Sequence, residues 1–436
     1  MVRLQGLKAR QVLDSRGRPT VEVDAIASTG VIGRAIVPSG ASTGRHEAFE
    51  LRDGEGATYG GLGVRQAVAN VGELIAPAVV GMDLEDQGSL DAALIALDGT
   101  PNKGRLGANA ILGVSLAVAH AAAAARGESL FVSLNRLWNA RVGPEVGIQP
   151  LIPMPMVNMI SGGLHAGGCL DIQDVLIIPR SASSYSQALE RIVAVYHDLG
   201  RLLRGSGFES ALVGDEGGYG PRLESNEQAF EFVVEAIVAA GLEPGRDVVL
   251  AVDVASSRFY DPETGVYHLK RGGEARLDSG GMVDMIAGWI ERFPIVSVED
   301  GLAEDDWVGW TDLTARLGKR VQLVGDDLFV TQSSRIELGH ERKSANAVLI
   351  KVNQVGTLSE TLDALACAHR QGMRGVVSAR SGETEDATIA DLAVATAAGQ
   401  IKIGAVARSE RLAKYNRLLR IEEELGSRCR FATELF

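Results

Sequence analysis

Lys351 is the residue around which the candidate chemistry of this sequence is arranged. It directly follows the unbroken apolar run 347–350, which predicts a short strand that is buried on both faces. At the end of such a strand, desolvation and neighbouring cations lower the pKa of a lysine and make it a usable general base. A single strand-end lysine more often reaches solvent along its aliphatic stem, so this interpretation depends on the residues that gather around it.

Three further apolar runs end at a carboxylate. They are VVLAVDVASS with Asp253, FPIVSVED with Glu299 and VQLVGDDLF with Asp326. Taken alone, each acid is more often a capping or turn residue than a ligand. In a parallel barrel, however, all strands end on one face, so the three acids would converge with Lys351 in one mouth. Three carboxylates with no nearby His or Cys suit a hard cation, magnesium before zinc, with positions left open for water and substrate.

Four glycine-rich segments could surround a bound anion. They are PSGASTG, SGGLHAGG, GDEGGYG and ARSGETED. Any one of them could be only a turn, but together they would supply mobile backbone donors around a group of phosphate size. Arg380, in the last of them, can add a bidentate contact to such a group.

The pattern of elements predicts two domains, residues 1–141 and 142–436. The first contains strand-like segments at 21–28 and 31–38 and then helical patterns at 84–97 and 108–138, which is typical of a compact α+β domain. The boundary is marked by VGPEVGIQPLIPMPM, which carries four of the thirteen prolines in the chain.

Beyond this boundary, strands alternate with helices. The predicted order is DIQDVLIIP, a helix at 185–205, ALVGDEGG, a helix at 227–240 and VVLAVDVA, and the alternation continues to QIKIGAVA. Such alternation predicts an α/β fold with a parallel β/α barrel, whose active site lies at the carboxyl ends of the strands. Gly61-Leu62-Gly63 lacks the third glycine of a dinucleotide fingerprint and follows no good strand, and the chain has no P-loop.

Composition limits the possible partners. The chain has 436 residues, of which 46% are hydrophobic and 23% charged, and this is a globular composition. A net charge of −13 argues against binding to nucleic acid or to an anionic membrane, so an anionic substrate needs a local positive site. The three cysteines form no CxxC pair, the start resembles no signal peptide, and the apolar stretch 114–125 is too short to span a bilayer. We therefore expect a soluble cytoplasmic protein.

Several separated motifs resemble the signatures of the enolase family, in that family's order. They are VLDSRGRPTVEV, VPSGASTG, LVGDEGG, SVEDGLAEDDW, LVGDDLFVTQ, LIKVNQVGTLSET, RSGETED and GQIKIGA. The resemblance covers essentially the whole chain. It implies an N-terminal α+β capping domain, a C-terminal β/α (TIM-like) barrel of the irregular enolase kind, and two Mg²⁺ ions per active site. It also implies a small phosphorylated hydroxy-acid substrate and a homodimer, or an octamer built from dimers.

The resemblance also assigns roles to individual residues. It implies that Lys351 removes the proton alpha to a carboxylate and that Glu216 protonates the leaving hydroxyl, with Asp174 in the same acid cluster. The remaining implied residues are the metal ligands Asp253, Glu299, Asp326 and Ser42, the phosphate contacts Arg380 and Ser381, the second lysine Lys402, and the pocket residues His165 and Gln173.

The sequence departs from the family pattern at positions close to these residues. Ala379 stands where the family has histidine, and Asp174 stands where the family has glutamate. Lesser changes are Ser161 for asparagine and Gly-Leu for Pro-Phe at 301–302. One lost hydrogen bond to a charged group costs about 1.5–3 kcal/mol, on the order of ten- to a hundredfold in rate.

Three functions therefore remain open. The first is the dehydration of 2-phosphoglycerate to phosphoenolpyruvate. The second is the same chemistry on a bulkier or modified phosphoryl substrate, such as formation of a carboxyphosphonoenolpyruvate-type product in phosphonate or phosphinate biosynthesis. The third is a non-catalytic structural role. Because replacing histidine by alanine opens space, Ala379 is a candidate specificity residue for the second.

Overall fold

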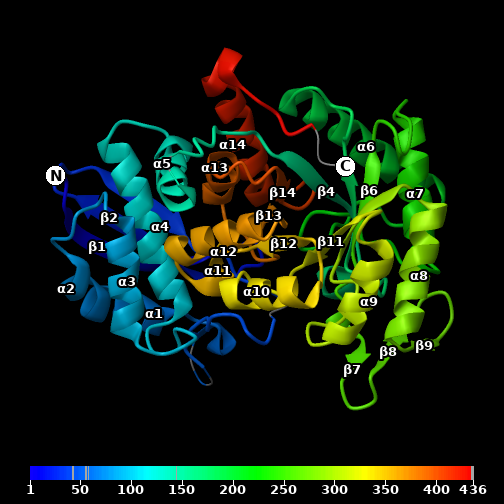
Figure 1. Cartoon of the computed structure of the whole chain (residues 1–436), viewed down its shortest axis with the longest axis horizontal. Coiled ribbons are helices and arrows are strands. Elements are labelled where there is room, and N and C mark those ends of the chain that lie inside the picture. The colour runs from blue at the N-terminus through cyan, green and yellow to red at the C-terminus, as the bar shows by residue number, and fades with distance from the viewer. Residues whose placement is uncertain (42–43, 55, 57, 144, 434–436) are drawn as a thin grey trace.

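The computed structural model describes residues 1–41, 44–54, 56, 58–143 and 145–433. An N-terminal α+β domain lies beside a barrel that is surrounded by helices (Figure 1). This is the expected fold class, an α/β barrel with an N-terminal cap.

The N-terminal domain is a three-stranded antiparallel sheet covered by helices. The sheet has the order β1-β2-β3, with β1 at Leu4–Leu13, β2 at Pro19–Ala27 and β3 at Ile32–Ile36. The helix α4 (Ala108–Ala125) packs directly on β2 and β3. A Cβ atom on Gly33 would lie 2.1 Å from the backbone nitrogen of Ala121, so glycine at this position lets helix and strand approach closely. The other helical segments of the domain are η1 (Thr58–Gly61), α1 (Arg65–Asn70), η2 (Val71–Ile75), α2 (Ala76–Val79), α3 (Gln87–Asp98) and α5 (Leu130–Val142).

Two predictions for this domain need correction. The strand β1 was not anticipated, because LQGLKARQVL mixes apolar and charged residues without a clean alternation. The single helix expected at 108–138 is two helices, since Gly127 adopts a left-handed backbone conformation (φ 66°) between α4 and α5. Of the described helices, α4 is long and apolar enough to cross a membrane, but 83% of it is buried, and it forms the core of this domain.

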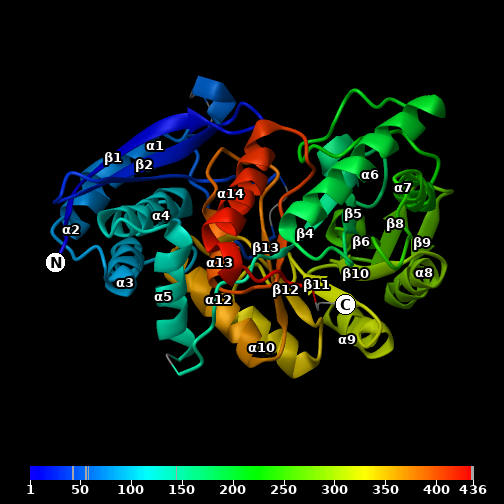
Figure 2. The same ribbon diagram turned by 90° about the horizontal axis from the view of Figure 1, so that it is seen from above.

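The barrel is closed by eight strands in the order β10-β11-β12-β13-β14-β4-β5-β6. Their bounds are β4 (Met154–Ser161), β5 (Asp174–Ile178), β6 (Val249–Asp253), β10 (Ile295–Glu299), β11 (Gln322–Gly325), β12 (Ala347–Ile350), β13 (Arg374–Ser378) and β14 (Gln400–Lys402). Outside them lie α6 (Tyr185–Gly205), α7 (Asn226–Ala239), α8 (Ser279–Arg292), α9 (Trp307–Leu317), α10 (Ser333–Arg342), α12 (Leu358–Arg370), α13 (Thr388–Ala395) and α14 (Ser409–Leu425), as Figure 2 shows from above. Shorter elements are η3 (Gly163–Ala166), η4 (Ser256–Arg258), α11 (Val352–Val355), η5 (Gly426–Arg428) and a small sheet of β7 (Tyr260–Asp261), β8 (Val266–Leu269) and β9 (Ala275–Leu277).

The expectation of an entirely parallel barrel is wrong at β5, which runs antiparallel to both β4 and β6. A parallel return needs a crossover, usually a helix, but β4 and β5 are joined by a loop that contains only the short turn η3. The segment 211–218, expected as a strand, is a loop with an isolated bridge between Val213 and Tyr219. Consequently α6 and α7 follow each other between β5 and β6. This irregular order agrees with what the resemblance implied for the barrel.

Candidate active site

Alternation along the barrel strands decides which side chains point into the mouth. Ala347 and Leu349 belong to the small apolar cluster inside the barrel. Lys351 lies two residues beyond Leu349, so its side chain leaves the chain on the same side. The same parity leads from Ala251 to Asp253 on β6 and from Val324 to Asp326 just after β11. The strands therefore point three of the four groups that the sequence analysis placed at strand ends into the same mouth.

Two buried ammonium groups contact the three predicted metal-binding acids. Lys402 Nζ lies 2.9 Å from Asp253 Oδ2 and 2.8 Å from both carboxylate oxygens of Glu299. Lys351 Nζ donates to Asp326 Oδ2, and Gln354 Nε2 donates to Asp326 Oδ1 at 2.9 Å.

The electrostatics of the two lysines differ from the expectation. Burial alone would lower the pKa of Lys351, but Asp326 and Glu299 outweigh it and raise that pKa, which is opposite to the predicted lowering. Burial likewise opposes the charge of Lys402, yet Asp253 and Glu299 raise its pKa well above the ordinary value. Both side chains are therefore held as ammonium ions by their carboxylate partners. Lys351 can become a base only when Asp326 is engaged by another cation.

The donor set fits a hard divalent cation. Asp253, Glu299 and Asp326 are all at least 90% buried, and buried carboxylates need a positive partner. Ligand atoms of Asp300, Asp326 and Asp327 already lie within 4.8 Å of one another. Ser42, the fourth predicted ligand, lies outside the described residues.

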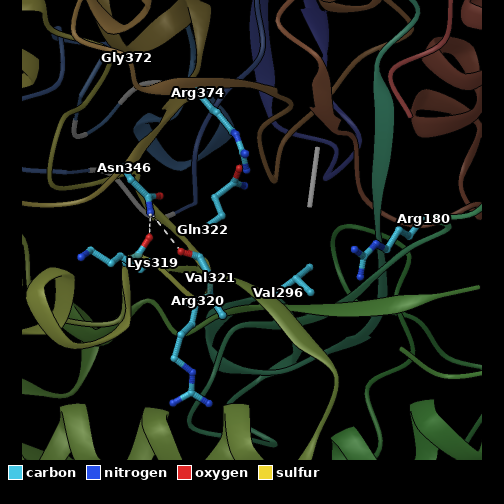
Figure 3. A pocket seen from close by; sticks show the side chains of 10 residues that line it. Arg180, Val296, Lys319, Arg320, Val321, Gln322, Asn346, Gly372 and Arg374 are labelled. Carbon is cyan, nitrogen blue, oxygen red and sulfur yellow. Dashed lines mark hydrogen bonds between the residues drawn. The ribbon is translucent and has the colours of Figure 1, made fainter. Parts of the chain in front are cut away.

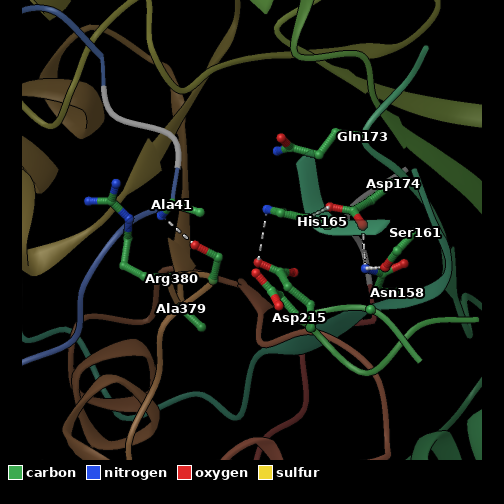
Figure 4. Close-up of polar contacts among 12 residues, drawn as sticks. Ala41, Asn158, Ser161, His165, Gln173, Asp174, Asp215, Ala379 and Arg380 are labelled. Carbon is green, nitrogen blue, oxygen red and sulfur yellow. Dashed lines mark hydrogen bonds and ion pairs between the residues drawn. The ribbon is translucent and has the colours of Figure 1, made fainter. Parts of the chain in front are cut away.

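A second cluster joins an imidazole to two carboxylates (Figure 4). His165 Nδ1 lies 3.0 Å from Asp174 Oδ2, and its Nε2 lies 3.9 Å from Glu216 Oε1. Burial would lower the pKa of His165, but the two carboxylates raise it to about 9, so the ring is an imidazolium at neutral pH. Asn158 Nδ2 donates to the other oxygen of Asp174 and, at 3.0 Å, to Ser161 Oγ. The cluster is thus oriented by side chains of β4.

The pKa values of the two carboxylates in this cluster are shifted in opposite directions from their ordinary values. Burial raises the pKa of Asp174, and the nearby imidazole only partly offsets it. Burial also opposes ionisation of Glu216, but His165, Arg411 and Lys402 together lower its pKa. Glu216, the residue that the resemblance implies is the acid, is therefore ionised at neutral pH.

Arg380 and Ser381, the two predicted phosphate contacts, form hydrogen bonds with residues of the N-terminal domain. Glu47 forms a bidentate ion pair with Arg380, at 2.9 Å to Nη1 and 3.1 Å to Nη2, and Asn353 Oδ1 accepts from Nη1 at 2.8 Å. Ser381 Oγ accepts from the backbone nitrogen of Ala41 at 2.6 Å. The Glu47 carboxylate thus occupies the guanidinium face that a substrate anion would need. No sequence signal distinguished this glutamate, because nothing marks it in the segment RHEAFE.

Nine of the thirteen predicted site residues line one small polar cavity, and Asp174, Glu299 and Asp326 contact residues of its wall. Its volume is about 10 Å³, which is about the room that one water molecule needs. The lining residues are His165, Gln173, Glu216, Asp253, Lys351, Ser378, Ala379, Arg380, Ser381 and Lys402. Gln173 Nε2 donates to Asp253 Oδ2 at 3.1 Å, while its Oε1 is buried with no hydrogen-bond partner among the described residues. Gln173 Oε1 can therefore accept a hydrogen bond from water or substrate.

Ala379 contributes only a methyl group to the cavity wall. Its backbone nitrogen donates to the carbonyl of Lys402 at 2.9 Å, so its position is fixed by the pairing of β13 with β14. The residue is 5% exposed and lies below Arg380 in Figure 4, across the site from His165. A hydrogen-bonding side chain at this position would reach the space between the two sides.

Comparison with known families covers nearly the whole chain. Residues 4–134 match the family profile described as Enolase, N-terminal domain. Residues 149–436 match the profile described as Enolase, C-terminal TIM barrel domain.

Proposed function

Because the chain belongs to the enolase family, we propose that it is a magnesium-dependent hydro-lyase that removes water from 2-phosphoglycerate or a close analogue. Family membership supports an enolase-like lyase in general. The observation that carries the proposal is that one cavity is lined by a buried lysine, an imidazole–carboxylate cluster and an arginine, beside the carboxylates that would hold the metal. A proton alpha to a carboxylate is weakly acidic, and bound Mg²⁺ would stabilise the negative charge that its removal creates.

Each protein group has a defined task in this proposal. Asp253, Glu299 and Asp326 would hold the cation. Lys351, released from Asp326, accepts the alpha proton at Nζ. The cluster of His165, Asp174 and Glu216 supplies a proton to the leaving hydroxyl from the other side of the cavity, and Arg380 and Ser381 bind the anionic phosphoryl group.

A second candidate substrate is favoured by Ala379. Its methyl group leaves the cavity wall without the imidazole that the family pattern has there, which suits a bulkier or modified phosphoryl group. The product in that case would be a carboxyphosphonoenolpyruvate-type compound formed by the same proton abstraction and elimination. For either substrate we propose a cytoplasmic homodimer or larger assembly of dimers.

Product identification tests the substrate. Phosphorus NMR of the purified protein with Mg²⁺ and 2-phosphoglycerate, and separately with a phosphonate analogue that carries the same hydroxy acid, should show conversion of one to its enolpyruvate. Failure to convert either compound, together with an absence of Mg²⁺ binding by calorimetry, would support the non-catalytic alternative instead.

Replacement of the base tests the mechanism. In Lys351→Ala, exchange of the substrate's alpha proton with solvent deuterium should be abolished, because no other group is assigned to accept that proton. Mg²⁺ binding, measured by calorimetry, should remain, since all three acids are retained. Exchange that persists in the variant would mean that another residue is the base.

A further inference from the structure

The segment 351–360, which begins with the candidate base, is held in place by the N-terminal domain. Lys351 follows β12 and leads through α11 into α12; α4 packs against both of these helices and α3 packs against α12 (Figure 1). Ala48 N donates to the carbonyl of Gln354 at 2.8 Å. The side chain of Gln354 in turn donates to Asp326, the acid that Lys351 contacts. A contact between the domains is therefore linked directly to the partner of the candidate base.

The turn between α11 and α12 packs closely on the N-terminal domain. Gly356 lies in this turn with a φ of +91°, and a Cβ atom there would come within 2.9 Å of Lys103 Cδ and 3.2 Å of Ala108 Cβ. Lys103 is buried and extends past this point, so that its Nζ lies 2.7 Å from Glu360 Oε1. The turn therefore has no room to move toward the N-terminal domain.

The first turn of α12 depends on the N-terminal domain for its hydrogen bonds. Its first three backbone nitrogens each donate to a side-chain oxygen. The pairs are Leu358 with Ser115 Oγ at 2.9 Å, Ser359 with Asp91 Oδ2 at 2.9 Å and Glu360 with Thr357 Oγ1 at 3.1 Å. Thr357 is the helix's own cap, whereas Asp91 belongs to α3 and Ser115 to α4. Because an α-helix has no acceptors of its own for these nitrogens, the N-terminal domain completes the start of α12.

Asp91 is fully buried, and a buried carboxylate needs favourable partners. Its Oδ2 faces the N-terminus of α12, where the helix dipole favours negative charge, and its Oδ1 accepts from Gln87 Nε2 at 3.1 Å. Burial raises the pKa of Asp91, and neutral hydrogen-bond donors oppose that rise. The start of α12 is thus one of the partners that stabilise this carboxylate.

The opposite ends of β12 and α12 are fixed by the barrel itself. Asn346 immediately precedes β12, and its Nδ2 donates to the carbonyls of Gly318 and Val321 at 2.9 and 3.1 Å (Figure 3). The carbonyl of Asn346 accepts from Arg374 N at 3.2 Å, where the chain returns from α12 to begin β13. Since both elements are held at that end, the contacts with the N-terminal domain decide where the candidate base lies.

We propose that Asp91 is a positioning residue for the reaction. By accepting from Ser359 N it holds the start of α12, and with it α11 and Lys351, in the place where the base acts. This inference rests on the proposed function, in which Lys351 accepts the alpha proton. Without Asp91 a buried amide has no acceptor, and a shift of the first turn of α12 relieves it. An offset of about 1 Å at a reacting group can cost about a hundredfold in rate, so a small shift is measurable.

Exchange of the alpha proton with solvent deuterium tests the role in catalysis. The assay uses Mg²⁺ and whichever of 2-phosphoglycerate and the phosphonate analogue the unchanged protein converts. Asp91→Ala should lower kcat for this exchange by about tenfold or more, because Lys351 is displaced, while KM changes less than about twofold, since Arg380 and Ser381 are retained.

The conservative variant Asp91→Asn separates positioning from a general loss of structure. It keeps an oxygen that can accept from Ser359 N, and Gln87 can turn to accept the new N–H, because its Oε1 has no partner among the described residues. Asp91→Asn should therefore keep kcat within about threefold of the unchanged protein. An equal loss of kcat in Asp91→Asn and Asp91→Ala would contradict the role of this hydrogen bond.

Asp391→Ala is the matched control. Asp391 is also buried, and its Oδ1 accepts from Phe131 N in the first turn of α5 at 3.0 Å, across the same domain boundary. In the part of the chain that the structure describes, its other hydrogen-bond partner is Arg417, so it does not contact segment 351–360. Asp391→Ala should change kcat less than about twofold, although it too loses stability. Thermal unfolding confirms that both alanine variants are folded.

Amide hydrogen exchange, followed by mass spectrometry, tests the positioning without any substrate. Peptides that cover 352–361 should exchange about tenfold faster or more in Asp91→Ala, and at the unchanged rate in Asp391→Ala. The inference is overturned if these peptides exchange equally in Asp91→Ala and the unchanged protein, or if the two alanine variants lose kcat equally. If the unchanged protein exchanges no alpha proton, the proposed function fails instead, and amide exchange alone decides whether Asp91 holds this segment.

Discussion

Lys402→Met is the most informative single change, because it removes one buried charge and retains a side chain of similar length. Lys402 Nζ lies within 2.9 Å of oxygens of both Asp253 and Glu299, and all three residues are buried. Without the ammonium, these two carboxylates lose the positive partner that contacts both of them. Removing one partner from a buried ion pair costs about 3–5 kcal/mol, so in EDTA the free energy of unfolding should fall by about that amount.

Magnesium should reduce this deficit. In the unchanged protein the cation must share Asp253 and Glu299 with the ammonium of Lys402, whereas in the variant that contact is absent. Removal of the competing charge should tighten Mg²⁺ binding by about tenfold or more, which corresponds to about 1.4 kcal/mol. In saturating Mg²⁺ the variant should therefore recover at least that part of the lost stability relative to the unchanged protein.

The assay is urea unfolding, followed by circular dichroism, in EDTA and in Mg²⁺. Lys414→Met is the matched control, because Lys414 is also a buried ammonium, 2.6 Å from Glu383 Oε2, yet contacts none of the three acids. It should be destabilised comparably in both solutions. An identical deficit for Lys402→Met with and without Mg²⁺ would refute the assignment of Asp253 and Glu299 as ligands.

Three further changes test other parts of the molecule. Ala379→His with Asp174→Glu should raise turnover of 2-phosphoglycerate more than tenfold, because a restored hydrogen bond to a charged group is worth about 1.5–3 kcal/mol; an unchanged rate would show that specificity lies elsewhere. Glu47→Gln should tighten binding of a phosphorylated substrate about tenfold, since Arg380 no longer has to be released, and weaker binding, measured by calorimetry, would contradict this competition. Burial opposes ionisation of Asp24, but arginines of β1 and β3 lower its pKa to about 2, so its contribution is present above pH 4 and lost as the pH falls toward 2. Because those arginines are solvent-screened, Asp24→Asn should cost only about 1 kcal/mol in urea unfolding at pH 6 and nothing near pH 2; a constant deficit would refute this titration.

The placement of charged groups at strand ends was predictable from the sequence because it depends only on local rules. An apolar run that stops at a charged residue fixes both the burial of the strand and, through the period of two, the direction of its last side chain. Lys351, Asp253 and Asp326 all follow this rule, and closure of the barrel then brings them together. The direction of each strand in the barrel was less predictable. The reversal of β5 depends on the length of the loop before it and on the strands beside it, and the sequence of β5 itself does not indicate its direction.

Contacts between the domains could not be predicted from local patterns. Glu47 and Arg380 are separated by 333 positions, and their ion pair exists only because the N-terminal domain lies over the barrel mouth. The raised pKa of Lys351 has the same origin, because it reflects which carboxylate lies nearest to the ammonium. Sequence reasoning paired the charged groups with a ligand, whereas in this structure they pair with one another.

The electrostatics of the acid cluster bear on how the leaving hydroxyl would receive its proton in the proposed reaction. The proton of the cluster lies on His165, because Asp174 and Glu216 raise the pKa of the imidazole to about 9 while Glu216 itself stays ionised. The three groups are close enough to titrate as a unit, so we expect the acid of the proposed reaction to be the cluster rather than one residue. Asp174 then acts by orienting the ring through Nδ1, and Ala379 alters the wall across the cavity. Because the two departures affect opposite sides of the same leaving group, reversing one alone should restore less activity than reversing both.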